Sequence, residues 1–143
     1  MTVPSSRVAS LAPMADLDTH LQMIQTTIGR LAGQSTTIKG WCVTLTSALL
    51  GLGATSTTAM LPGVAIYVIG VFALLDAYYL TLERGYRTLY DTTRTRTTTD
   101  WAMTTSAPKL TSIRQALTSW SIAPLYGTSL ALAVATTIYA AYR

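Results

Sequence analysis

Asp76 is the residue whose surroundings most strongly suggest chemistry. It is the only side chain with a full charge between Lys39 and Glu83, in a stretch that is otherwise apolar or uncharged. A carboxylate inside such a segment is costly to bury, so it indicates either a functional group, such as an ion or proton site, or a buried ion pair. The expected chemistry is therefore binding, conduction or gating.

Lys39 is the expected partner of Asp76. The midpoint between the two residues falls between residues 57 and 58, inside a predicted turn at 55–62. If the flanking segments form a helical hairpin, residues equidistant from its turn lie at the same depth. The sequence thus predicts an ion pair near the cytoplasmic interface, and breaking it would destabilise the hairpin. A role for Asp76 in conducting ions or in gating stays open beside this structural pairing.

No set of catalytic residues is recognisable. His20, the one histidine, is expected to be solvated on the polar side of an amphipathic helix. The acidic residues are too scattered to form an acid–base pair, and we find no metal-ligand cluster, glycine-rich phosphate loop or Ser/His/Asp set. We therefore expect a protein that is not an enzyme and needs no cofactor or metal. Cys42 is the only cysteine, so an intramolecular disulfide is excluded.

The elements that must position Asp76 are predicted to be membrane-spanning helices. Charged residues make up 11% of the chain, whereas about 25% is usual in soluble domains. Mainly apolar runs long enough to cross a bilayer, with at most one charged residue each, occur at about 37–54, 63–80 and 120–142. The predicted fold class is an all-α integral membrane protein with three transmembrane helices, an N-terminal amphipathic helix and an oligomeric state.

The chain divides into five predicted segments. Residues 1–15 are expected to be a flexible leader, and 16–33 an amphipathic helix that Gly33 weakens or ends. This helix carries a heptad stripe that would lie on the membrane or on a neighbouring protomer: Leu17, Leu21, Ile24, Ile28 and Leu31. The remaining segments are a transmembrane hairpin with a cytoplasmic helical extension at 37–91, a Thr-rich cytoplasmic loop and short helix at 92–118, and a third transmembrane helix at 119–143.

The basic residues predict the topology. All but Arg143 lie before or at the start of the first span or between the second and third, and the turn between the first two spans has none. The positive-inside rule then places the N-terminus and residues 81–118 in the cytoplasm and the C-terminus outside. A cytoplasmic interface is predicted at Glu83, Arg84, Arg87, Arg94 and Arg96, with an ion pair between Glu83 and Arg87. Its expected partners are anionic lipid headgroups, and no nucleic acid is expected.

Small residues recur at helical spacing on all three predicted spans. Such faces let helices approach closely in lipid, so we expect them to pack within and between protomers. The residues are Ser47 and Gly51 on the first span, Gly63 and Gly70 on the second, and Gly127, Ala131 and Ala135 on the third.

Two stretches, IKGWCVTLTSALLGL at 38–52 and LLDAYYLTLERGYRTLYD at 74–91, carry a resemblance. They resemble a family of small, uncharacterised bacterial multi-pass membrane proteins. That family is similar in plan to SLATT-type antiphage membrane effectors, which pair a helical membrane hairpin with a separate sensor or signalling protein. The resemblance covers residues 16–91. It implies these family-defining residues: Lys39, Gly40, Trp41, Asp76, Tyr78, Tyr79, Glu83, Arg84, Arg87, Tyr90 and Asp91.

The function expected from these features is that of a small oligomeric effector in the bacterial inner membrane. It would open a pore or disrupt the bilayer in antiphage defence when a cytoplasmic sensor or signalling protein triggers it. One alternative is an ion channel or small transporter subunit with Asp76 as its ion site. The other is a non-catalytic membrane scaffold that recruits a cytoplasmic partner through residues 81–118.

Overall fold

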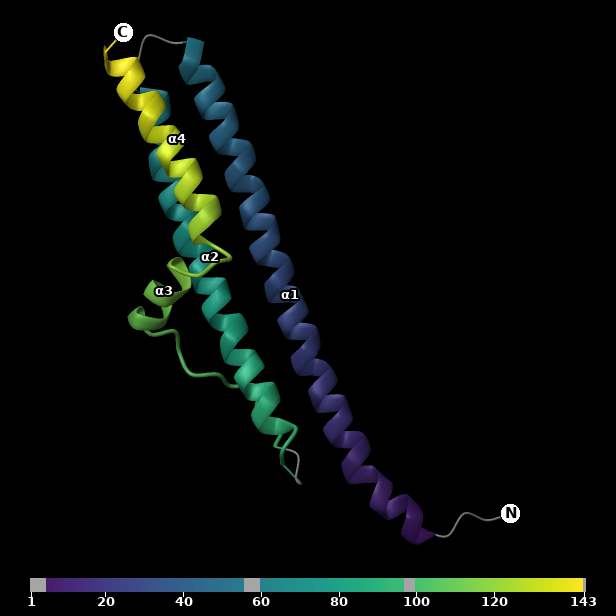
Figure 1. The fold of residues 1–143 in the computed structure, drawn as a ribbon. Helices are drawn as coiled ribbons and strands as arrows, with labels where there is room; N and C mark the ends of the chain where they lie inside the picture. Colours follow the sequence, from purple (N-terminus) through teal and green to yellow (C-terminus); the bar gives the residue numbers. More distant parts are fainter. Residues whose placement is uncertain (1–4, 56–59, 97–99, 143) are drawn as a thin grey trace.

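The computed structural model describes residues 5–55, 60–96 and 100–142. Over these residues it contains four helices and no strand, as the all-α prediction requires. They are α1 (Ser5–Thr55), α2 (Met60–Thr93), α3 (Leu110–Leu117) and α4 (Ala123–Tyr142). Figure 1 shows α1 and α2 as a long antiparallel hairpin, with α4 beside the half of α2 that is nearer the hairpin turn. The short helix α3 lies against the side of α2.

The hairpin keeps one register along its whole length. Near the turn, a Cβ atom added to Gly53 would lie only 2.8 Å from Cγ of Pro62. Towards the other end, the side-chain amide of Gln25 donates a hydrogen bond of 3.1 Å to the Tyr90 hydroxyl. Each of these pairs is equidistant from the middle of the turn, as Lys39 and Asp76 are. The register inferred from the sequence therefore holds from Gly53 back to Gln25.

The N-terminal part of the chain differs from the prediction. Helix α1 begins at Ser5 and runs without a break through Gly33, so the flexible leader at 1–15 and the helix end at Gly33 are wrong over the described residues. A glycine inside a helix costs only about 1 kcal/mol. Contacts with α2 offset that cost, because the buried face of α1 continues on both sides of Gly33, from Ile24 to Ser35 and Cys42.

The heptad stripe is covered within the chain. Ile24 is fully buried, and Leu21, Ile28 and Leu31 are half-buried on the side of α1 that packs against α2. Contacts within the chain therefore cover much of this stripe, for which the sequence analysis had predicted the membrane or a neighbouring protomer as the cover.

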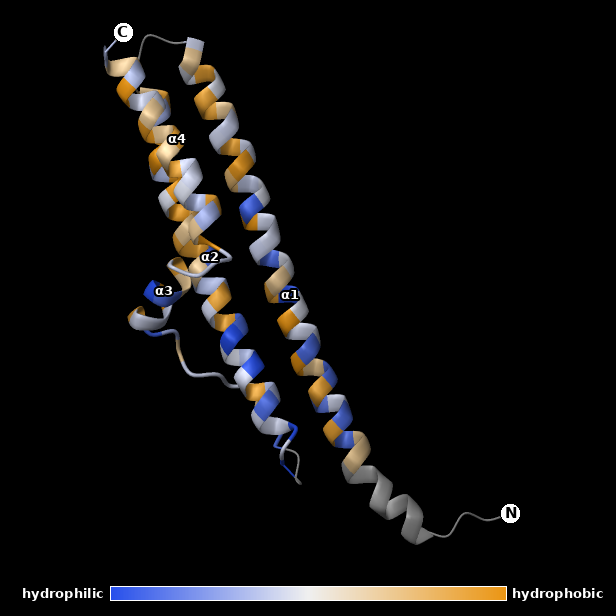
Figure 2. Cartoon of the chain, viewed as in Figure 1, coloured by the Kyte–Doolittle hydropathy of each residue, from blue (hydrophilic) through white to orange (hydrophobic). Residues whose placement is uncertain are grey.

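Length and composition identify two helices that could cross a membrane, α2 and α4. Helix α1 does not meet the same test, because its uncharged part, residues 40–55, is short and rich in Thr, Ser and Gly. Figure 2 shows hydrophobic residues along α4, in the part of α2 nearest the turn and in bands along α1, while hydrophilic residues gather at the far end of α2 and in the half of α1 far from the turn. The last helix begins at Ala123, later than predicted, because hydrogen-bonded turns occupy residues 118–122.

The small residues do not pack the helices of one chain together. A Cβ atom added to Gly51, Gly63, Gly70 or Gly127 would meet nothing within 4 Å. Ser47, Ala131 and Ala135 are exposed. Helix α4 instead packs through its opposite side, with Tyr126 and Ala133, and Ile122 just before the helix is buried as well. The prediction of packing within the protomer at these residues is therefore wrong, and Gly53, which sequence reasoning missed, is the glycine at a close helix approach.

Candidate functional site

The candidate site is built around the Asp76 carboxylate, which is 0% exposed. The Ser35 hydroxyl donates a hydrogen bond of 2.5 Å to Oδ1 of Asp76. The Nζ atom of Lys39 lies 2.7 Å from Oδ2 of Asp76 and donates a second hydrogen bond, of 2.6 Å, to the Ser35 hydroxyl. These three side chains form a closed polar triangle between α1 and α2. We call these three side chains, together with Tyr126, the Asp76 cluster.

The spacing on α1 explains how two of its residues reach one carboxylate. Ser35 and Lys39 are four positions apart, so they lie on the same face of the helix, one turn apart. The long lysine side chain bends back over Ser35, and 23% of it remains exposed. Sequence reasoning found Lys39 and Asp76 but missed Ser35. The signal that could have found it is a hydroxyl residue one turn from the lysine, on the face that meets α2.

Tyr126 is the residue of α4 that lies at this site. It is 5% exposed, and its hydroxyl lies close enough to Asp76 to interact with it. The hydroxyl nevertheless makes no hydrogen bond of normal geometry with any described residue. The sequence analysis did not single out Tyr126 as a site residue. The residue joins the third long helix to the buried ion pair.

The Asp76 cluster stands at one end of the uncharged parts of the three long helices. From Met60 to Asp76 helix α2 rises about 24 Å, and α4 rises by a similar amount from Tyr126 to Tyr142. Beyond the cluster, toward the hairpin turn, large hydrophobic side chains are exposed around all three helices: Trp41, Val43, Leu45, Leu52, Val64, Tyr67, Val71, Leu74, Leu130, Leu132, Val134 and Ile138. The cluster is thus the last charged group before a slab with an apolar surface.

The predicted cytoplasmic interface residues are spread along one end of the hairpin. Glu83 is buried and pairs with Arg87 at 2.5 Å, the ion pair expected from their spacing. Arg94 lies 3.6 Å from Asp91, and Arg96 lies 3.9 Å from Asp100. Arg84 makes no ion pair within the part of the chain that the structure describes, and it lines a surface pocket instead. These residues form no single cluster.

His20 is buried, which corrects its expected place on a solvated face. It is 1% exposed, and its ring lies 5.5 Å from the ring of Trp101. Neither ring nitrogen has a hydrogen-bond partner among the described residues. The prediction failed because the helical pattern of α1 says nothing about the segment after α2, which returns along α1 and brings Trp101 over His20.

The fold and the site define an all-helical protein in which a buried Ser–Lys–Asp network joins two long helices and a tyrosine brings in a third. Within the described residues, no three His, Cys, Asp or Glu side chains are grouped so that they could hold a metal ion. Compared with known proteins, the chain matches no family model, no curated protein and no solved structure.

Proposed function

We propose that the protein is a small oligomeric membrane effector that opens a pore or disrupts the bilayer of a bacterial cell, with the Asp76 cluster holding its closed state. The observation that carries the proposal is the placement of this cluster at the junction of α1, α2 and α4, at one end of their uncharged parts. Removing one partner of a buried ion pair leaves an uncompensated charge. A trigger that separates Lys39 from Asp76 would therefore favour another packing of the helices.

The exposed apolar surface between the Asp76 cluster and the hairpin turn, the apolar slab, supports a lipid bilayer as the environment of this part of the protein. Its height of about 24 Å, extended by the hairpin turn, approaches the roughly 30 Å of a hydrocarbon core. Exposed Trp41, Leu45 and Leu52 support the second half of α1 as a third span, although its composition alone does not identify it. Lys39 at the edge of the slab can extend its ammonium toward the headgroups. The basic residues beyond it favour a cytoplasmic N-terminus and an outer C-terminus.

The exposed small residues support an oligomer. On α1 they follow one another three or four positions apart along a single exposed face: Gly33, Thr37, Gly40, Thr44, Ser47, Gly51 and Ala54. A Cβ atom added to any of the three glycines among them would meet nothing within 4 Å, so the face is open to another helix. Small residues on a lipid-facing surface favour close association of protomers.

A role in antiphage defence rests on the resemblance of residues 16–91 to SLATT-type effectors. On this proposal a cytoplasmic sensor or signalling protein would contact the segment 81–118, which holds the polar end of α2, the loop and α3. The signal would reach the membrane through α2, because Asp76 and this segment share one continuous helix.

The test is the release of potassium and of a small dye from living bacteria after induced expression. The wild type should release both rapidly, and Asp76→Ala and Lys39→Ala should change the rate in the same direction. Arg87→Ala is the matched control, because it removes an ion pair within a single helix and leaves the interhelical pair intact. Equal release from all four proteins would contradict a gating role of the Asp76 cluster.

The same experiment separates the alternatives. A channel or transporter with Asp76 as its ion site requires ion-dependent flux that Asp76→Asn abolishes. Against it stands the carboxylate itself, fully buried with both oxygens engaged. A scaffold would cause neither release nor a growth defect, and it would co-purify with a soluble protein bound through residues 81–118.

A further inference from the structure

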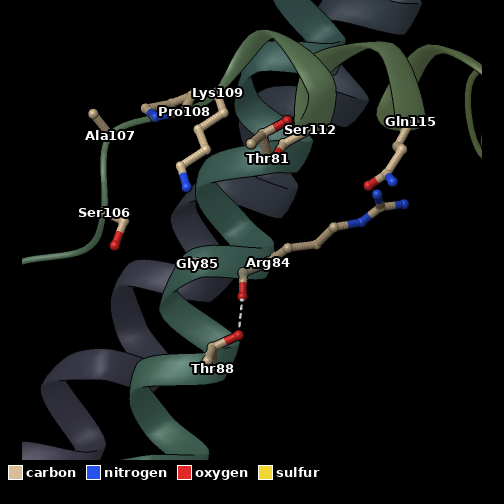
Figure 3. Close-up of a pocket in the computed structure, with 10 residues that line it drawn as sticks. All are labelled: Thr81, Arg84, Gly85, Thr88, Ser106, Ala107, Pro108, Lys109, Ser112 and Gln115. Carbon is tan, nitrogen blue, oxygen red and sulfur yellow. Dashed lines mark hydrogen bonds between the residues drawn. The ribbon is translucent and has the colours of Figure 1, made fainter.

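A pocket of about 330 Å³ lies beside the polar end of α2, between this helix, the segment that precedes α3 and α3 itself (Figure 3). The residues of the Asp76 cluster take no part in it. Its lining combines two basic residues with hydroxyl and amide side chains, and includes no acidic residue: Thr81, Arg84, Gly85, Thr88, Ser106, Ala107, Pro108, Lys109, Ser112 and Gln115.

Two uncompensated cations border the pocket from different elements. Arg84 extends from α2 toward Gln115 on α3, and Lys109 projects from the segment before α3 into the space beside α2 (Figure 3). Neither cation has an ion pair among the described residues, whereas Arg87 and Arg94 are paired with carboxylates. The pocket therefore carries two positive charges that nothing described in the chain neutralises.

The hydroxyl groups add hydrogen-bond donors. Thr81 and Thr88 donate to main-chain carbonyl groups of α2. The hydroxyls of Ser106 and Ser112 make no hydrogen bond in the described structure, so both are free to donate to a ligand. Together with the two cations and the Gln115 amide, they give the lining several donors, with Lys109 and Ser106 on one side of the view in Figure 3 and Arg84 and Gln115 on the other. A phosphate group, with several anionic acceptor oxygens, is the ligand that such a set of donors fits.

The backbone holds these donors in place. The returning segment packs against α2 at Gly85, where an added Cβ atom would be in ordinary contact with Thr105, 3.4 Å from its Cβ, and a larger side chain would not fit without a shift. Helix α3 begins immediately after Lys109 and has no side-chain cap on its first turn. Its unpaired N–H groups add positive potential at the rim, next to Ser112.

We propose that this pocket binds a phosphate group, with Arg84 and Lys109 as its charged ligands. Two sources share this chemistry, an anionic lipid headgroup and a soluble phosphate compound. The position favours the headgroup: Thr81 and Arg84 follow Asp76 by about 8 and 12 Å along α2, beyond the apolar slab. That preference rests on the proposed membrane orientation, but phosphate binding itself does not.

The test uses the purified full-length protein in a neutral detergent and follows its melting temperature. The added probes are dihexanoyl phosphatidic acid, inorganic phosphate and, as a neutral comparison, dihexanoyl phosphatidylcholine. Ligand binding to the folded state raises the melting temperature in a saturable way. Arg84→Gln and Lys109→Gln should each lower the affinity for the stabilising probe about ten-fold. Arg114→Gln is the matched control, an exposed cation of α3 that does not line the pocket.

A further variant, Gly85→Leu, keeps every charge but pushes the returning segment away from α2, so it should weaken binding as well. Stabilisation by phosphatidic acid alone would assign the pocket to a lipid headgroup, and equal stabilisation by inorganic phosphate would assign it to a soluble ligand. Absence of saturable stabilisation by either probe would overturn the proposal. An equal loss of affinity in Arg114→Gln would overturn it too, because it would show diffuse attraction between charges. These results do not depend on ion release from cells, so this proposal and the effector function can fail separately.

Discussion

The Nζ atom of Lys39 lies 2.7 Å from Oδ2 of Asp76, and the two side chains are unequally buried: the carboxylate is 0% exposed and the lysine 23%. A lysine can swing its ammonium toward water or headgroups along its flexible stem, whereas the carboxylate has no such path. Removing Lys39 and removing Asp76 should therefore lower the stability of the protein by different amounts.

We expect Lys39→Met to destabilise the protein more than Asp76→Asn. The first substitution leaves a buried carboxylate with the Ser35 hydroxyl as its remaining donor, which should lower the free energy of unfolding by about 3–5 kcal/mol. The second leaves a lysine that can still reach solvent, and should lower it by roughly 1–2 kcal/mol. Denaturation in detergent micelles, followed by circular dichroism, measures both values.

The double variant Lys39→Met/Asp76→Leu is the control for this asymmetry. Replacing both charges with apolar groups removes the desolvation cost as well as the attraction, so most of the lost stability should return. If the losses of the single variants simply add in the double variant, the two residues are not energetically coupled.

Gly53→Ala should destabilise the hairpin. The new methyl group would lie 2.8 Å from Cγ of Pro62, in a ring that cannot rotate away, and such overpacking costs about 1–3 kcal/mol. Gly29→Ala is the matched control, because it is the same change in the same helix with nothing within 4 Å. There the higher helix propensity of alanine should stabilise the protein by up to about 1 kcal/mol. Equal melting temperatures for the two variants would show that the hairpin is looser at Gly53.

His20→Phe should keep Trp101 in place. The imidazole is buried without a hydrogen-bond partner among the described residues and serves as an aromatic surface for the Trp101 ring. Phenylalanine preserves that surface and removes two buried polar atoms, so stability should stay equal or rise by about 1 kcal/mol. His20→Ala should instead release Trp101 and increase its quenching by acrylamide in a Trp41→Phe/Trp120→Phe background. Unchanged quenching in His20→Ala would show that the histidine does not hold the indole.

The sequence was sufficient for features that depend on one charge and its distance from a turn. Lys39 and Asp76 could be paired because no other residue with a full charge lies between them in the sequence. In addition, two antiparallel helices place residues that are equally far from the turn at the same level. Helices α2, α3 and α4 also followed from composition, with boundaries shifted by a few residues at α4.

Features that depend on which face meets another segment could not be predicted. The periodicity of α1 shows an apolar stripe but not its cover, so its packing against α2 and the burial of His20 under Trp101 were missed. The small residues of α4 do share one face of the helix, but that face is exposed and lies opposite the buried face that holds Tyr126 and Ala133. A spacing gives the period of a helix, and only tertiary contacts choose the side that is buried.

Gly51→Leu should reduce self-association and leave the single protomer intact. Nothing lies within 4 Å of a Cβ atom at Gly51, so the leucine meets no atom of its own chain, and its helix propensity exceeds that of glycine. A second helix packed closely on this face would be displaced by the new side chain. Cross-linking in detergent should therefore yield smaller species at an equal or higher melting temperature. Leu52→Trp adds bulk at the neighbouring exposed position, off the small-residue face, and should not change the cross-linked species. If Gly51→Leu and Leu52→Trp both leave the oligomer unchanged, this face of α1 contacts lipid and the protomers associate elsewhere.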